Sequence, residues 1–288
     1  MIEAWGRWGA DDERGMINAV GPAQVMRALS TVVEGVSLSL AAPIAHNQGF
    51  GLVGRTPPAH YMVRCGGDYA AGLPERGGFG FADDVISLPT HGATHVDALS
   101  HVWRDGTMYN GFSADNVSSR GARRLGAEKM GPLVTRGIFL DSCPSGLRPV
   151  AEPIHANELT SMLADAHVSL EPGDALLVRT GWLEASLRGE VDAHEWPGLD
   201  RDCADLLAAA DVTLVGADNP GVECFPSTDP DCQVPLHLAL IRGRGVYFSE
   251  LLDLSELSTR GRSEFMLALA PLPFVGAVGS PVAPIAIL

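Results

Sequence analysis

The segment from His91 to His101 constrains this chain more than any other, because it places three histidines and an aspartate within eleven residues. The whole chain has only nine histidines, so packing alone does not account for that density. Neutral imidazole nitrogens and carboxylate oxygens bind Zn²⁺ and similar divalent cations, and three protein ligands with one open position make a catalytic site. His95 and Asp97 are two positions apart, so an extended backbone points both to one side. Gly92 lets the chain bend to bring His91 round, and the segment therefore predicts a metal site held by His91, His95 and Asp97.

The composition describes a chain that can bury a large core. It has 288 residues, of which 46% are hydrophobic, and this suits one large domain or two small ones. Lysine and arginine number 20 against 35 for aspartate and glutamate, so the formal net charge is −15. Such an acidic chain has no electrostatic attraction for nucleic acids or anionic membranes, and we expect neither as a partner.

Targeting signals and cysteine usage favour a cytoplasmic protein. The first residues have no cationic stretch followed by an apolar one, so we expect no signal peptide. No apolar run approaches the roughly 18 residues that a membrane span needs. The five cysteines are an odd number without a Cys-x-x-Cys pair, which suits reduced thiols.

Extended and helical patterns alternate irregularly along the chain. Apolar runs and apolar–polar alternation predict strands at 36–40, 61–65, 85–88, 137–141, 173–182, 212–218, 245–252, 265–270 and 284–288. Periodic segments predict helices at 21–29, 155–166, 200–210 and 235–241, and the glycine-dense segment 66–84 is expected to be a loop. The chain shows no repeat and no linker-like tract. The pattern therefore predicts one α/β domain over residues 1–288 with a mixed β-sheet, on which residues 1–30 pack as an entry segment.

The segment Gly49–Gly54 matches the Gly-x-Gly-x-x-Gly fingerprint of dinucleotide-binding proteins letter by letter. That fingerprint works only when its last glycine opens a helix whose N-terminus holds pyrophosphate. Pro57 and Pro58 follow almost at once and oppose a helix. We expect a mobile loop near the active site instead, with Phe50 as a candidate lid residue.

The segment His91–His101 resembles the His-x-Gly-Thr-His-x-Asp-x-Pro-x-His signature of the cyclase family of metal-dependent hydrolases. That family includes kynurenine formamidases, isatin hydrolases and related lactone-opening enzymes. Ala93 stands where the family has glycine and Leu99 where it has proline, which affects loop shape but removes no ligand. The run Trp-Gly-Ala-Asp-Asp-Glu is similar to the N-terminal opening of longer members. The resemblance implies a swivelling β/β/α fold with a barrel-like core, and a homodimer or homotetramer.

The resemblance also implies where the rest of the site comes from. Similar proteins use a distal histidine on a helix and a glutamate that closes the next strand, and His237 and Glu250 have that context. By this carry-over they are metal ligands that complete the first site or hold a second ion, with Asp97 then bridging two ions. His101 corresponds to the family's general base and acid, and an imidazole beside a filled tetrahedral site is free for proton transfer. The expected cofactor is Zn²⁺ or Mn²⁺, as one or two ions.

These residues predict a hydrolase. Water made nucleophilic by the metal attacks a carbonyl group, and His101 carries a proton to the leaving nitrogen or oxygen. The family's substrates imply a small amide, N-formyl amide, cyclic amide or lactone.

Two other classes stay open. A non-haem iron oxygenase is consistent with His95-x-Asp97 and His237 as a facial triad, although that class is expected to have more strands and fewer helices. A non-catalytic metal- or ligand-binding protein is the second. A serine hydrolase is not supported, because the sequence contains no Gly-x-Ser-x-Gly motif. Whether Trp103, Tyr109 and Phe50 contact a substrate, and whether Asp218 orients the site or caps a turn, is left open.

Overall fold

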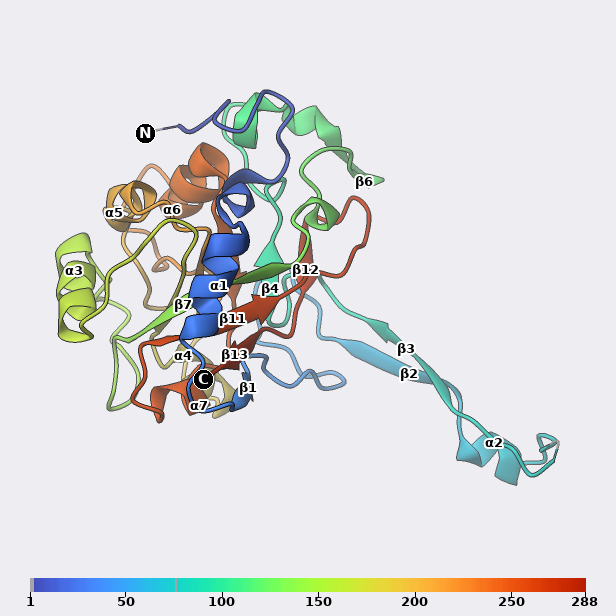
Figure 1. Ribbon diagram of the computed structural model, residues 1–288. Coiled ribbons are helices and arrows are strands. Elements are labelled where there is room, and N and C mark those ends of the chain that lie inside the picture. Colours follow the sequence, from blue (N-terminus) through green and yellow to red (C-terminus); the bar gives the residue numbers. More distant parts are fainter. Residues whose placement is uncertain (1–2, 76) are drawn as a thin grey trace.

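A nine-stranded mixed sheet forms the centre of the computed structural model, which describes residues 3–75 and 77–288 (Figure 1). The strands follow the order β1-β13-β11-β7-β8-β9-β10-β4-β12 across the sheet. Their bounds are β1 Ser37–Ser39, β4 His95–Asp97, β7 Leu133–Asp141, β8 Ala175–Arg179, β9 Leu214–Ala217, β10 Tyr247–Glu250, β11 Glu264–Leu269, β12 Gly279–Pro281 and β13 Ile285–Ile287. This mixed sheet in an α/β chain confirms the predicted fold class.

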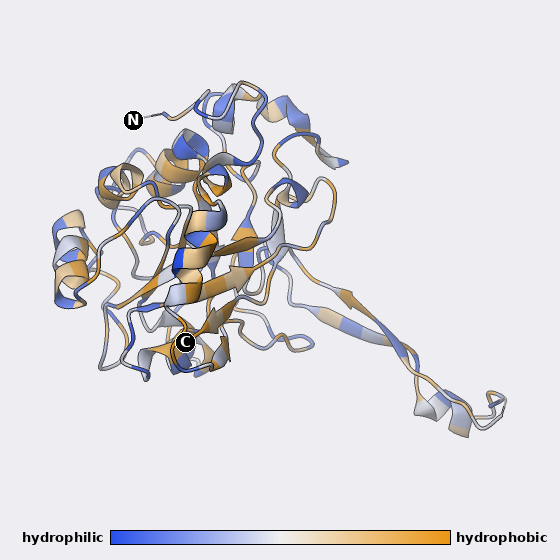
Figure 2. Ribbon diagram, viewed as in Figure 1, coloured by the Kyte–Doolittle hydropathy of each residue, from blue (hydrophilic) through white to orange (hydrophobic). Residues whose placement is uncertain are grey.

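The middle of the sheet is parallel and its two sides are antiparallel. Strands β7, β8, β9 and β10 run parallel to one another, whereas β11, β13 and β1 on one side and β4 and β12 on the other pair antiparallel. The central strands β8, β9 and β10 are buried along their whole length, as expected for strands covered on both faces. Strands β8 and β9 are mostly apolar in sequence for the same reason, and Figure 2 shows hydrophobic colour along strands of the sheet.

Helices cover this sheet. Helix α1 begins at Pro22, a residue preset for the first helical turn, and it lies across β7 and β11 (Figure 1). The helices are α1 Pro22–Ser30, α2 Gly66–Ala70, α3 Ala156–Asp165, α4 Trp182–Leu187, α5 Cys203–Ala209, α6 Pro235–His237 and α7 Ser255–Ser258. A π-helical turn, Leu238–Arg242, continues α6 without a break. The helices predicted at 21–29, 155–166, 200–210 and 235–241 correspond to α1, α3, α5 and α6 with that turn.

The entry segment is bound to the later part of the chain by side-chain contacts. The Trp5 indole donates to the backbone oxygen of Arg242, and the Arg7 guanidinium pairs with Asp211 at 2.5 Å. Both partners lie more than two hundred positions away in the sequence, so these contacts bind the start of the chain to its later half.

Two segments differ from the prediction. The segment 66–84 is not all loop, because Asp68 caps a short helix, α2, by accepting from the Cys65 amide. The second difference concerns the metal stretch, over which no strand was predicted. His95 and Asp97 lie instead within a buried strand of their own, β4.

A hairpin arm projects from the body of the molecule (Figure 1). The arm consists of β2 (Ala59–Arg64), α2 and β3 (Asp83–Ser87), and β2 pairs only with β3 among the described residues. A second small hairpin, β5 (Val117–Ser118) and β6 (Gly121–Ala122), lies on the body. No helix in the described part of the chain is both long and apolar enough to cross a membrane.

Candidate metal centre

Strand β4 brings the ligand candidates together because of its register with two neighbours. In the antiparallel pair with β10, Glu250 stands directly opposite His95, and in the pair with β12, Gly279 stands opposite Asp97. Side chains of residues i and i+2 share a face of a strand, and directly opposed residues share it too. The side chains of His95, Asp97 and Glu250 therefore meet on one face of the sheet.

Gly279 leaves room for the first histidine. A Cβ atom added at Gly279 would overlap the Nε2 atom of His91. The imidazole of His91 occupies the space in front of Asp97 that a side chain on β12 would otherwise fill. Its Nδ1 lies 3.0 Å from the Thr90 hydroxyl, which leaves Nε2 directed at the carboxylate.

His237 reaches the same place from α6 and is held there by a buried glutamate. Its Nε2 lies 3.6 Å from Asp97 Oδ2 and 3.3 Å from Glu250 Oε1. Its Nδ1 makes a short hydrogen bond with Glu223 Oε1, and Glu223 also accepts from the amides of Leu236 and His237. A carboxylate on one ring nitrogen fixes the tautomer and leaves the other nitrogen as a lone-pair donor, an arrangement common around ligating histidines.

The buried nitrogen and oxygen atoms that converge at this site do not form hydrogen bonds with one another. His91 Nε2 and His95 Nε2 lie 3.1 and 3.3 Å from Asp97 Oδ1, and His95 Nε2 lies 3.2 Å from Glu250 Oε2. These pairs are close enough for hydrogen bonds but lack the angles, and five buried atoms have no hydrogen-bond partner: His91 Nε2, His95 Nε2, Asp97 Oδ1, Asp97 Oδ2 and Glu250 Oε1. Buried polar groups are nearly always paired, and unpaired ones call for an explanation such as an ion. Nitrogen and oxygen donors directed at a shared space fit a divalent cation.

The charges of the cluster point the same way. Burial lowers the pKa of His95, but Asp97 and Glu250 outweigh it and raise that pKa to about 10. The pKa of His237 is likewise raised against burial, by Asp97, Glu223 and Glu250. Burial raises the pKa of Asp97, yet the surrounding imidazoles hold it well below its usual value. The two carboxylates therefore stabilise positive charge among them, and a divalent cation bound there would supply that charge in place of the imidazole protons.

His101 lies beside the cluster at its edge. Its ring stacks on that of His91, with centroids 4.1 Å apart and planes 26° apart, and it is less buried than the other five residues. Desolvation, with His91 and His237 nearby, lowers its pKa to about 4 despite the opposite effect of Asp97 and Glu250. The donor atoms of His91, Asp97 and His101 lie within 4.8 Å of one another, as do those of His95, Asp97 and Glu250. The two overlapping triads share Asp97, the residue predicted to bridge two ions.

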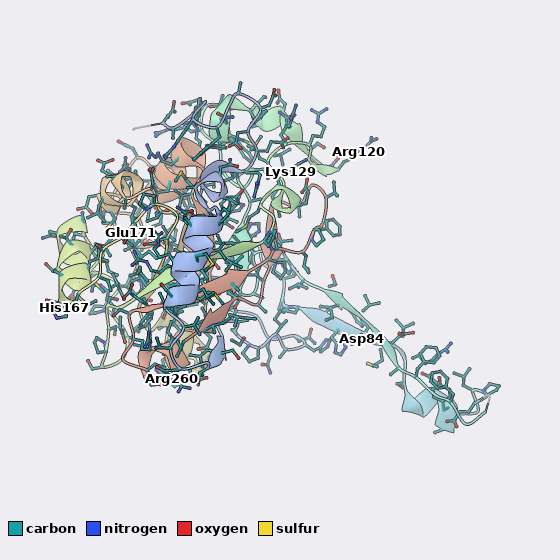
Figure 3. The ribbon with its side chains drawn as sticks, viewed as in Figure 1. Asp84, Arg120, Lys129, His167, Glu171 and Arg260 are labelled. Atoms are coloured by element: carbon teal, nitrogen blue, oxygen red, sulfur yellow. The ribbon has the colours of Figure 1, made fainter. Side chains whose placement is uncertain are left out.

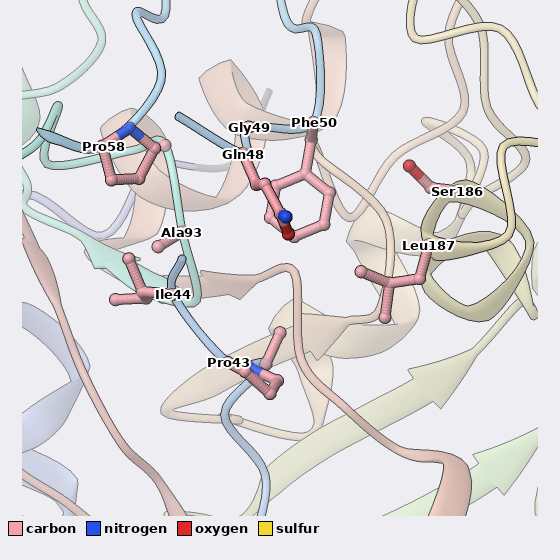
Figure 4. A pocket seen from close by; sticks show the side chains of 11 residues that line it. Pro43, Ile44, Gln48, Gly49, Phe50, Pro58, Ala93, Ser186 and Leu187 are labelled. Carbon is pink, nitrogen blue, oxygen red and sulfur yellow. The ribbon is translucent and has the colours of Figure 1, made fainter. Parts of the chain in front are cut away.

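A small cavity lies against the backbone of the metal stretch. Its volume is about 160 Å³, and Phe50, Ile44 and Leu187 line it together with Gly92 and Ala93 (Figure 4). The loop predicted at 49–54 is thus beside the metal segment, and no helix follows its last glycine. Thr94 of the metal stretch accepts through its hydroxyl from the amide of Ala42, another residue of the cavity wall, and donates to the Leu251 carbonyl.

The other open candidates lie elsewhere or have another task. Tyr109 is buried and its hydroxyl donates to Asp12, so it packs in the core and anchors the entry segment. Trp103 is half exposed just beyond His101. Asp218 accepts from the Thr180 amide and hydroxyl and from the Gly181 amide, which caps the turn that leads into α4. This is the turn-capping alternative of the two left open for Asp218.

With this geometry established, the comparisons place the chain. The family model described as "Putative cyclase" matches residues 35–224. The chain belongs to the cyclase family. The matched range includes the metal stretch and Glu223 and ends before His237 and Glu250.

Relatives in this cyclase family cover the remaining residues. A solved structure described as a novel cyclase is 34% identical and covers 100% of both chains with a TM-score of 0.90. The kynurenine formamidase of Salinibacter ruber is 29% identical over 201 residues, which are 68% of this chain and 76% of that protein. Isatin hydrolase A from Labrenzia aggregata, solved with benzyl benzoate, shares the fold at 17% identity and a TM-score of 0.66. The match covers 91% of this chain and 98% of that one. The nine-stranded sheet is thus the cyclase fold.

Two residues of the site have no counterpart in the prediction. Glu223 is one of 35 acidic residues and lies in an irregular stretch after β9, where no local pattern distinguishes it. Gly279 is one of 33 glycines, and its importance depends on a strand pairing with β4 that is far away in sequence. Predicting the role of Glu223 or Gly279 would require knowledge of which strands pair and in what register, and sequence periodicity does not give that.

Proposed function

We propose that this protein is a metal-dependent hydrolase that opens a small amide, N-formyl amide, cyclic amide or lactone. The observation that carries the proposal is the set of five unpaired, converging donor atoms on His91, His95, Asp97 and Glu250. Membership of the cyclase family and the similarity to a kynurenine formamidase support hydrolysis of a carbonyl compound. In this proposal, residues 1–288 form a single domain that carries the whole activity.

His91, His95, Asp97, Glu250 and His237 are the proposed metal ligands. When bound there, a divalent cation such as Zn²⁺ or Mn²⁺ lowers the pKa of a coordinated water and polarises a carbonyl group. Asp97 is central because its two oxygens face different histidines, Oδ1 toward His91 and His95 and Oδ2 toward His237. Glu223 holds His237 in place and is a positioning residue.

His101 is the proposed proton carrier. It lies at the cluster's edge, stacked on His91, where a substrate can reach it. A neutral imidazole there takes a proton from the attacking water and returns it to the leaving nitrogen or oxygen. The cavity beside Gly92 and Ala93, with its apolar walls at Phe50 and Leu187, is the proposed place for an apolar part of the substrate.

Turnover assays on metal-loaded enzyme test this proposal. The panel should contain formanilides, cyclic amides and aryl lactones, with each product identified as the ring-opened or deformylated carboxylate. Carboxylate formation that stops on chelation and returns with metal is the expected result. Tight binding of these compounds without turnover would favour a carrier protein, and oxygen uptake on iron loading would favour the oxygenase. The oxygenase alternative also has little support from a sheet with four parallel central strands.

A further inference from the structure

Residues 3–13, here called the strap, make contacts that the proposed function does not explain. The side chain of Glu13, at the end of the strap, is only 14% exposed. Its Oε2 accepts from the Leu125 amide at 2.8 Å, and its Oε1 accepts from the Arg124 guanidinium at 2.9 Å. Figure 3 shows Lys129, four residues after Leu125, at the end of the molecule where the strap lies. Hydrogen bonds to an ionised carboxylate are about twice as strong as neutral ones, so Glu13 holds the Leu125 backbone firmly.

Leu125 connects Glu13 with the proposed proton carrier. The Leu125 carbonyl accepts from the amide of Ser100 at 3.2 Å, and Ser100 immediately precedes His101. Leu125 has a φ of 63°, in the left-handed region that residues with a side chain rarely adopt. Such a conformation persists only where surrounding contacts impose it. The bonds to Glu13 and Ser100 fix the peptide groups on both sides of Leu125, and through them Glu13 restrains the backbone that carries His101.

A second contact of the strap lies nine residues after His101. Asn110 has a φ of 58°, and its side-chain amide donates to two backbone oxygens of the strap at 3.0 and 3.2 Å. Its Oδ1 accepts from the Gly6 amide at 2.7 Å. The strap therefore holds two left-handed residues, Asn110 and Leu125, in the chain that follows His101.

The strap also contacts the chain that follows the ligand candidate His237. The π-helical turn begins one residue after His237 and ends at Arg242, which is buried. Arg242 donates to the backbone oxygen and the hydroxyl of Thr107 at 2.9 and 2.8 Å, and to Glu3 at 2.7 Å. The Trp5 ring covers the guanidinium, whose carbon lies 4.7 Å from the ring centroid. Because Thr107 belongs to the chain after the proton carrier, the strap and Arg242 join the two segments that lead away from the site.

The His101 ring depends on support of this kind. It stacks on His91 and its centroid lies 6.4 Å from that of His237, but its imidazole makes no hydrogen bond within residues 3–75 and 77–288. The backbone and the stacking contact therefore set its orientation. A general base acts within about 2.6–3.2 Å of the group whose proton it takes, and a displacement of about 1 Å can cost about 100-fold in rate.

We propose that the strap positions His101 for proton transfer, and that Glu13 is its principal positioning residue. The proposal rests on the proposed function, in which His101 carries the proton. The strap acts on the geometry of catalysis through Leu125 and Ser100, and it contacts neither the substrate nor the metal.

Steady-state kinetics of the metal-loaded, full-length Glu13→Ala variant test the proposal. We expect kcat to fall by about tenfold or more, while KM and metal content stay unchanged, because no ligand or substrate contact is lost. Glu13→Gln keeps an oxygen for the Leu125 amide and should recover most of the rate. Glu158→Ala is the matched control, since it removes a two-bond pair with Arg148 on α3, which lies apart from β4 in Figure 1, and its kcat should be that of the wild type.

A second variant covers the case in which Glu13→Ala does not fold. Asn110→Gly removes the side-chain contacts to the strap, and glycine adopts the same left-handed backbone without strain. Its kcat should fall at unchanged KM as well. Wild-type kcat in both Glu13→Ala and Asn110→Gly, or in Asn110→Gly alone where Glu13→Ala does not fold, would overturn the proposal.

The same change in a His101→Ala background separates positioning of His101 from general loosening of the fold. If Glu13 acts through His101, adding Glu13→Ala to His101→Ala should lower kcat by less than about twofold, because the group that it positions is already absent. A loss of about tenfold in both backgrounds would show a merely structural role and would overturn the proposal.

The imidazole NMR signals of the full-length protein give a readout that does not need turnover. The His101 signal is the one that His101→Ala removes, and Glu13→Ala should shift it while the signals of His46 and His60, exposed near the arm, stay in place. A wild type that hydrolyses none of the compounds would reject the proposed function, and this measurement would then decide on the strap alone. An unmoved His101 signal in Glu13→Ala would overturn it.

Discussion

Glu250 faces His95 across the antiparallel pair of β10 and β4, with Oε2 and Nε2 3.2 Å apart and both residues buried. A hydrogen bond between them would satisfy both groups, yet His95 Nε2 has no partner of acceptable geometry. Neither residue is in the other's sequence neighbourhood, so the contact exists only because the sheet sets their register. The pair forms half of the proposed metal site.

The first prediction concerns Glu223. Glu223→Gln replaces one acceptor oxygen by an amide that cannot accept from the Leu236 or His237 backbone, so His237 is held less firmly. We expect metal affinity to fall about 10- to 100-fold with the fold intact. Competition titration with a chromophoric chelator measures it, with exposed Glu152→Gln as the control. Equal affinities in the two variants would remove Glu223 from its positioning role.

Gly279 supplies a steric prediction. Gly279→Ala places a methyl group where His91 Nε2 lies, so the imidazole must turn away from Asp97. Metal content should fall, while the thermal unfolding of the metal-free protein changes little. Gly66→Ala is the control, since a Cβ there meets nothing within 4 Å. A Gly279→Ala enzyme with wild-type metal content would contradict the packing described for His91.

Asp218 gives a pH dependence of stability. Burial is the main cause that raises its pKa from 3.8 to about 6, with Glu184 adding to it and the Thr180 and Gly181 donors opposing it. A carboxyl group whose pKa is higher in the folded state stabilises the protein fully below the unfolded pKa, and that contribution is lost as pH rises through 6. Relative to Asp218→Asn, the free energy of unfolding of the wild type should therefore fall by about 2 kcal/mol from pH 4 to pH 7. Urea denaturation at several pH values measures this, and a constant difference would refute it.

The sequence allowed the metal stretch to be predicted because its ligands are local. His91, His95 and Asp97 lie within seven residues, and their spacing suffices to bring them together. Most strands were also predictable, since β7, β8 and β9 are rich in apolar residues. His237 and Glu250 required the family resemblance, because nothing near them in the sequence indicates a shared site.

The parts that escaped prediction depend on long-range pairing. The three-residue strand β12 has no periodicity to detect, and it is a strand because β4 lies beside it. The two strands of the arm were predicted at 61–65 and 85–88. Their projection from the body was not, because it is a tertiary feature. Strand β4 lies inside the sheet because it pairs with β10 and β12. Its own three residues, His95–Asp97, include two polar or charged side chains and do not indicate a buried strand.

His101 should be separable from the ligands. If it carries protons, His101→Ala keeps its metal and loses turnover by about 10² to 10⁴. If it is a ligand, as the triad with His91 and Asp97 allows, metal content falls as it does in His95→Ala. Metal analysis and single-turnover rates on the same preparations decide between them, and near-normal turnover would remove His101 from the mechanism.

Metal stoichiometry of wild type and Asp97→Ala, by elemental mass spectrometry after dialysis, tests the central claim most directly. Asp97 faces His91, His95 and His237, so its loss should empty the centre and abolish hydrolysis together. Asp202→Ala, at an exposed residue of the group His155, Asp200 and Asp202, is the matched control and should keep its metal. The account predicts one or two divalent ions per wild-type chain and almost none in Asp97→Ala. Full metal occupancy in Asp97→Ala, or its loss in Asp202→Ala, would contradict it.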